Sequence, residues 1–294
     1  MNNTINNSDY VICMDASGDI VKEIAVENGI EFVPMEYSLG EEMRVSHGCE
    51  EETLLQKFYD GQRSGDLTKT SQISPFMYEE YFRKFLENGK SVLYFCLSSG
   101  LSSTYDSSRL AAENLKEEFP NLEVLSIDTL AATGGMGLLA EKAIENRKRG
   151  MNIHENFEVI QTLVPKIRHY FMVQDLMYLK RGGRVGAATA LVGSALNIKP
   201  MLKIDEYGKL ITTDKKRGDK AAMTALFSFF KENYNEELSN VIYICDADTP
   251  ELAKLLGEKI KEEAPNVIIH RTMLSPIIGA HTGPGMLAVI LLGK

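Results

Sequence analysis

A hydroxyl-rich segment precedes one predicted helix in the first half of the chain. KTSQISPF (69–76) carries Thr70 and Ser71 in front of a helix start that Ser74 and Pro75 mark. Hydroxyl groups and the free backbone N–H groups of a helix start can together bind an anion. The alternative is that Ser74 only caps the helix and that Thr70 is an ordinary loop residue.

A second hydroxyl-rich segment, CLSSGLSSTYDSS (96–108), joins an apolar run to another predicted helix. Ser98, Ser99 and Ser102 surround Gly100, whose missing side chain permits a sharp turn. Hydroxyls at the end of a strand can donate hydrogen bonds to an oxyanion. The GxSxG pattern of a nucleophile elbow is absent, because residues 100–104 read GLSST. A serine-rich turn that caps the helix is the alternative.

One histidine lies in a segment rich in Gly and Pro near the end of the sequence. In SPIIGAHTGPGML (275–287) the pattern predicts a loop that holds His281 just before a final strand. A histidine held in such a loop is more often functional than one on a helix face. None of the five histidines forms an HxxxH or HExxH pair, so we expect no metal site.

Positive charge is concentrated in two segments, one glycine-rich and one just after a predicted strand. The cations concerned are Arg181, Arg184, Lys215, Lys216 and Arg217. The glycine-rich segment fits neither GxxxxGK[ST] nor GxGxxG, so it is weak evidence for a nucleotide. For the downstream run, a solvated turn is the alternative to a surface that binds phosphate or a partner.

The composition limits the kinds of partner. With 32 Lys+Arg against 41 Asp+Glu, the net charge of -9 argues against nucleic acid, whose binding depends on phosphate neutralisation. No stretch reaches the ~20 apolar residues of a membrane helix, and residues 1–10 lack the apolar core of a signal peptide. We therefore expect a cytoplasmic protein without a membrane span, for which only transient membrane contact is open.

To bring these segments together, the chain must alternate strands and helices. Near-continuous apolar runs predict strands at 10–17, 31–39, 91–99 and 122–128, separated by helical patterns. Such runs are typical of a parallel sheet covered by helices on both faces. Ligands bind these sheets beyond the carboxyl ends of the strands, where Asp15, Ser17, Ser98, Ser99 and Asp128 are expected to gather.

The second half has a different pattern. Strands are predicted at 169–175, 198–204, 209–215, 240–246, 266–273 and 286–293, with helices at 219–233 and 250–263. We therefore expect a mixed sheet with helices. Because 294 residues exceed the usual size of one hydrophobic core, the α/β chain is predicted to form two domains, 1–167 and 168–294.

Taken together, the motifs resemble those of the DegV family of bacterial lipid-binding proteins. In chain order they are TSQ-S (70–74), SSGLS-T (98–104), DLMYLKRGGRVG (175–186), NIKPML (197–202) and GAHTGPG (279–285). The resemblance extends over nearly the whole chain, and GAHTGPG and YLKRGGRVG are its most specific parts.

The resemblance implies a carrier that holds one long-chain fatty acid, with no catalytic residue and no cofactor. The residues that it assigns to the fatty-acid carboxylate are Thr70, Ser102 (with Ser99 as the alternative) and His281, supported by Ser71 and Ser98. In the family a separate fatty-acid kinase converts the bound ligand into an acyl phosphate for phospholipid synthesis. The five cations named above are then expected to dock that kinase or to steady the phosphate.

Two enzymatic functions stay open from the residues alone. A serine hydrolase or acyltransferase could use Ser102 or Ser99 with His281 and an acid such as Asp15 or Asp128.

A nucleotide- or sugar-phosphate-binding enzyme is the other possibility. It could use Asp128, Gly134, Gly135 and Gly137 in IDTLAATGGMG (127–137). That run follows a strand and opens a helix but lacks GxGxxG spacing, and its glycines can equally allow close packing of the helix on the sheet.

Overall fold

The computed structural model describes residues 9–186 and 197–293. The polar residues 1–8 and the small-residue stretch 187–196, both part of the sequence arguments, lie outside the described residues. Within the described part, no helix has the length and apolar character needed to cross a membrane.

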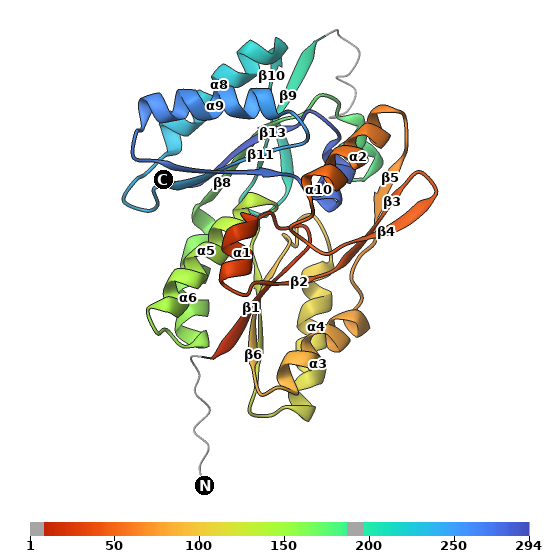
Figure 1. The fold of residues 1–294 in the computed structure, drawn as a ribbon, viewed down its shortest axis with the longest axis vertical. Helices are drawn as coiled ribbons and strands as arrows, with labels where there is room; N and C mark the ends of the chain where they lie inside the picture. The colour runs from red at the N-terminus through yellow and green to blue at the C-terminus, as the bar shows by residue number, and fades with distance from the viewer. Residues whose placement is uncertain (1–8, 187–196, 294) are drawn as a thin grey trace.

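A four-stranded parallel sheet forms the lower half of the molecule in Figure 1. Its strands, in spatial order, are β2 (Glu31–Val33), β1 (Tyr10–Asp15), β6 (Ser91–Cys96) and β7 (Val124–Asp128). Alternate residues of the fully buried β6 pack on opposite faces, Tyr94 toward α3 (Pro75–Leu86) and α4 (Thr104–Glu118), and Phe95 toward α5 (Gly134–Lys148). α1 (Lys22–Glu27) and α6 (Ile153–Leu163) pack on the α5 side. The predicted parallel sheet with helices on both faces is confirmed.

A six-stranded mixed sheet forms the second layer. Its order is β10 (Leu210–Arg217), β9 (Ile198–Ile204), β8 (Ile167–Met172), β13 (Leu287–Leu292), β11 (Val241–Asp246) and β12 (Ile268–Met273). Only β11 and β12 pair in parallel. On β13, Val289 faces α8 (Gly218–Asn233) and α9 (Pro250–Glu263), whereas Ala288 and Ile290 belong to the opposite face. The mixed sheet expected in the second half is therefore present.

A small antiparallel sheet was not foreseen. The prediction of one strand over 31–39 was wrong, because Pro34, which lacks an N–H group, separates β2 from β3 (Met35–Leu39). β3 pairs with β4 (Glu42–Ser46) and β5 (Thr68–Thr70), two short strands that carry no long apolar run. α2 (Glu52–Arg63) connects these two strands in the chain.

Helix α5 lies between the two larger sheets and contacts strands of both (Figure 1). It is buried all round over residues 134–140, which explains its mixture of Gly, Ala, Leu and Met. One hydrophobic cluster includes Tyr94 from the first sheet and Tyr243 from the second. All strands of the mixed sheet follow residue 166, while the division into domains 1–167 and 168–294 stays a prediction.

Candidate functional site

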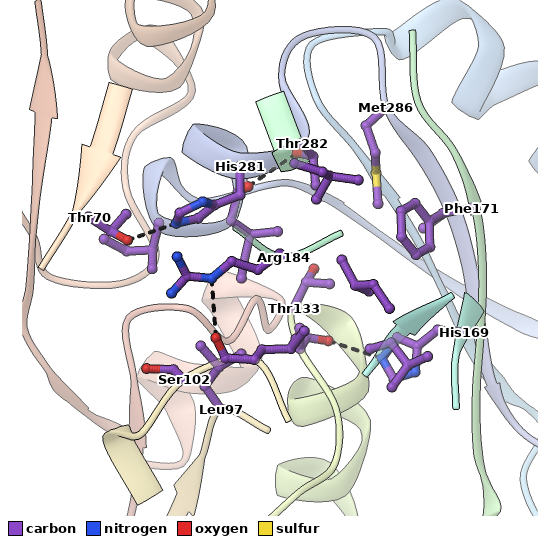
Figure 2. Close-up of a pocket in the computed structure, with 18 of the residues that line it drawn as sticks. Thr70, Leu97, Ser102, Thr133, His169, Phe171, Arg184, His281, Thr282 and Met286 are labelled. Carbon is purple, nitrogen blue, oxygen red and sulfur yellow. Dashed lines mark hydrogen bonds between the residues drawn. The ribbon is translucent and has the colours of Figure 1, made fainter. Parts of the chain in front are cut away.

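A cavity of about 340 Å³ lies between the loops after β6 and β7 and the inner face of the mixed sheet (Figure 2). Leu97 and Ala132 line it from the loops of the parallel sheet, and Phe171, Ala288 and Ile290 line it from the mixed sheet. The volume falls at the lower end of small-molecule sites, about 300–1,000 Å³. The cavity thus opens where a parallel sheet normally binds ligands, beyond the carboxyl ends of its strands.

Four of the polar lining residues lie at one side of the cavity. Figure 2 shows Thr70, Ser102, Arg184 and His281 on one side of the view and Phe171 on the other. Thr70 Oγ1 lies 2.8 Å from His281 Nε2. Ser102 Oγ lies 2.5 Å from Thr104 Oγ1 and also accepts a hydrogen bond from the Thr104 backbone N–H at 3.3 Å.

His281 lies on a helix, so the prediction of a loop was wrong. It belongs to the last turn of α10 (Pro276–Thr282). Pro276 occupies the first helical position, where its fixed φ favours the helix, and Gly283 ends the helix with a φ of 72°. The abundance of Gly and Pro therefore marks the two ends of a short helix.

Side chains from the first half of the sequence hold α10 in place. Gln62 Nε2 donates to the Gly279 carbonyl oxygen, and Thr68 Oγ1 donates to the Ala280 carbonyl oxygen, both at 3.0 Å. The Tyr59 hydroxyl donates to the carbonyl oxygen of Leu274, just before the helix, at 2.9 Å. These bonds fix the position of the imidazole that follows.

The imidazole of His281 is neutral near pH 7. Burial, with the nearby Arg184 charge, lowers the pKa of His281 to about 4. Its Nδ1 is buried and has no hydrogen-bond partner in the described structure. A β-carbon at Gly182 would lie 2.2 Å from Nδ1, so only glycine leaves room for the ring.

Among the described residues that line the cavity, only Arg184 carries a charged side chain, since the two lining histidines are neutral. Its Nε donates to the Leu101 carbonyl oxygen at 3.2 Å, and one terminal nitrogen donates to the Gly182 carbonyl oxygen. No carboxylate of the described chain pairs with it. Burial lowers the pKa of the Arg184 guanidinium, because its charge is poorly solvated.

The other predicted serines take different positions. Ser71 lines the cavity beside Thr70, but Ser98 and Ser99 do not. Ser98 is fully buried, and its Oγ donates to the Gly208 carbonyl oxygen at 2.8 Å. The side chain of Ser99 is exposed, so of the two alternatives only Ser102 borders the cavity.

Comparison with known proteins identifies the family. The family model described as uncharacterised proteins of the DegV family matches residues 10–294. The chain belongs to the DegV family. A DegV domain-containing protein of Clostridium perfringens (strain 13 / Type A) is 34% identical over 284 residues, which is 97% of each chain.

Two solved structures have the same fold. A fatty-acid-binding DegV family protein from Thermus thermophilus, 26% identical, matches with a TM-score of 0.81 over 97% of this chain and 100% of its own. The Streptococcus pneumoniae fatty acid kinase (Fak) B3 protein, loaded with linoleic acid, matches with a TM-score of 0.84 over the same shares at 22% identity.

The described residues of this DegV chain do not assemble a Ser-His-Asp triad. Asp15 accepts hydrogen bonds from the Leu97 backbone N–H at 2.8 Å and from the Tyr94 hydroxyl at 3.1 Å. Asp128 accepts from the backbone N–H groups of Ser99 and Leu130. Both carboxylates therefore brace the loops around the DegV cavity, and neither orients His281.

The glycines of 127–137 serve packing in this DegV structure. A β-carbon at Gly135 would lie 2.4 Å from His169 Nε2, and one at Gly137 would lie 2.3 Å from the Asp19 carbonyl oxygen. Such contacts leave no room for a phosphate group. The glycines instead let α5 approach both sheets, which was the alternative interpretation of this run.

The predicted partner-facing cations of the DegV chain do not form one cluster with Arg184. Lys215, Lys216 and Arg217 end β10, the edge strand of the mixed sheet, and Lys216 pairs with Asp214. Arg181 ends α7 (Met177–Arg181), and its guanidinium carbon lies 4.6 Å from the centroid of the Tyr178 ring. Within residues 9–186 and 197–293, no group of three potential metal ligands occurs.

Proposed function

We propose that this DegV protein holds one long-chain fatty acid in the cavity, with the carboxylate near Thr70, Ser102 and His281. The observation that carries the proposal is the distribution of polarity, with hydroxyls, an imidazole and one guanidinium without a carboxylate partner in the described residues at one side of a mainly apolar cavity. A buried carboxylate is costly unless it is hydrogen-bonded and charge-compensated. Arg184 supplies the positive charge in this arrangement.

The apolar wall accounts for the affinity. Each buried methylene contributes about 0.8 kcal/mol, so a tail of about fifteen methylenes contributes roughly 12 kcal/mol before association costs. Tight binding then needs few polar contacts. The ligand also offers a carboxylate to the free side of His281, where it would raise the pKa of the imidazole.

The protein acts in this proposal as a cytoplasmic carrier that presents its ligand to a fatty-acid kinase. The name of the Streptococcus pneumoniae neighbour supports a kinase partner. The exposed Lys215 and Arg217 offer a basic surface to it. A serine hydrolase is the weaker candidate, because the imidazole bonds to Thr70 and has no acidic partner among the described residues.

Native mass spectrometry of freshly purified protein, followed by lipid extraction, tests the carrier function. We expect one fatty acid per chain, lost or weakened in a Thr70→Ala/Ser102→Ala double variant. Ser99→Ala is the matched control, because its side chain lies outside the cavity. An empty protein that also fails to take up added palmitate or oleate would contradict the proposal.

Two further measurements test the kinase partner and the serine-hydrolase alternative. Arg217→Glu should slow acyl-phosphate formation in a system reconstituted with a bacterial fatty-acid kinase, whereas Lys254→Glu, at an exposed residue of α9, should not. Equal rates for both variants would remove Arg217 from the docking surface. Covalent labelling by a fluorophosphonate that disappears in Ser102→Ala would instead establish the hydrolase.

A further inference from the structure

The cavity contains a second histidine, far from the carboxylate end. His169 and Phe171 of β8 line the cavity, while Tyr170 between them faces the other way and stacks on Phe229 at 4.9 Å. In the sheet His169 pairs with Ile290, another lining residue. Figure 2 shows His169 on the opposite side of the view from Thr70.

The protonation state of His169 follows from its surroundings. The side chain is 5% exposed, and burial lowers the pKa of His169 to about 4, so the ring is neutral. Its Nε2 lies 3.2 Å from the Ala132 carbonyl oxygen. A carbonyl oxygen only accepts, so Nε2 carries the proton and Nδ1 is a bare acceptor.

No described residue donates a hydrogen bond to His169 Nδ1. Within the described residues, the single hydrogen bond of the His169 ring is the one from Nε2. The ring edge that carries Nε2 is packed against Ala132 and Gly135, which fixes its orientation. Nδ1 is not among the fully buried atoms that lack a partner, so it stays accessible at the cavity wall. A hydrocarbon chain that covers this acceptor leaves it unpaired at a cost in free energy, which a ligand that brings a donor avoids.

We propose that His169 Nδ1 is a recognition site for a hydroxyl group carried on the acyl chain, which makes the cavity selective for long-chain hydroxy fatty acids. This inference rests on the proposed function, because it assumes that the tail occupies the cavity. A plain hydrocarbon chain has no donor for Nδ1. A hydroxyl at the matching carbon donates to Nδ1 while the rest of the chain keeps its apolar contacts.

The alternative role for His169 is purely structural. Its Nε2–H would then only hold the Ala132 carbonyl at the start of α5, and the free nitrogen would have no consequence for the ligand. The two roles differ in one measurable respect, since only recognition makes affinity depend on a donor in the acyl chain.

Competition binding to delipidated wild-type protein tests the inference. The ligands are stearate, 10-hydroxystearate, 12-hydroxystearate and the methyl ether of each hydroxy acid. We expect one hydroxy acid to bind about tenfold tighter than stearate, as one regained hydrogen bond implies. Its methyl ether, which accepts but does not donate, should lose this advantage without any change to the protein.

The variant His169→Phe keeps a ring of similar size and removes the acceptor. We expect it to bind stearate and both hydroxy acids with affinities that no longer favour the hydroxyl. A preference that persists in His169→Phe, or equal binding of stearate and both hydroxy acids to the wild type, would overturn the inference while leaving the carrier intact. Failure of every ligand to bind would instead overturn the proposed function.

Discussion

Filling the cavity from β13 should shorten the acyl chain that the protein accepts. Ala288 is 1% exposed, lines the cavity and pairs in register with Phe171 across the sheet. Ala288→Leu adds three carbon atoms at this point, which displace about three methylenes of a long tail. At about 0.8 kcal/mol for each methylene, the loss is about 2.4 kcal/mol, or roughly 50-fold in affinity.

The assay is competitive displacement of a fluorescent fatty acid by saturated acids from lauric to stearic. The longest acids should lose most affinity in Ala288→Leu, and acids that end before Ala288 should lose little. Val289→Leu is the control, because Val289 belongs to the cluster on the opposite face of the sheet. Equal losses of affinity for every chain length would refute the prediction that the tail passes Ala288.

Three other perturbations test the polar side of the cavity. Gly182→Ala should push the His281 ring away and weaken binding, whereas Gly257→Ala, whose new β-carbon would meet no atom closer than 3.6 Å, should have little effect. Arg184→Gln should weaken fatty-acid binding by about 2 kcal/mol. It should also raise the pKa of His281, measured by NMR, and an unchanged pKa would contradict the electrostatic effect of Arg184 on this ring. Because burial lowers the pKa values of His169 and His281 from 6.5 to about 4, the unfolded chain binds more protons between these values. The free energy of unfolding should therefore fall as pH decreases from 6.5 to 4, by on the order of 3 kcal/mol for each histidine. In urea titrations of lipid-free protein, His281→Gln should make the free energy of unfolding depend less steeply on pH. An unchanged pH dependence would refute the lowered pKa of His281.

The layers of the fold could be predicted because apolar runs mark buried strands. Because these runs are apolar throughout, they do not indicate which of their residues line the cavity. β13 reads LAVILL, and nothing in this uniformly apolar run distinguishes Ala288 and Ile290, which face the cavity, from Val289, which faces α8 and α9. Face assignment requires alternation between polar and apolar residues, which a strand buried on both sides does not have.

The polar residues of the site were predictable as types and only partly as positions. Thr70, Ser102 and His281 all line the cavity, but Ser98 stands in an equally hydroxyl-rich context and bonds to Gly208 instead. That contact joins residues 110 positions apart, so local sequence holds no signal for it. Arg184 was grouped for the same reason with the cations expected to dock the kinase or to steady the phosphate, since its partner Leu101 lies 83 positions away in the chain.

The position of β13 inside the mixed sheet has a consequence for biosynthesis. This strand lies between β8 and β11, although both precede it in the chain. Until residues 287–292 have left the ribosome, β8 and β11 each present an unpaired edge, and the cavity lacks one wall. In the proposed function, loading of the fatty acid into its final site would therefore follow the emergence of β13.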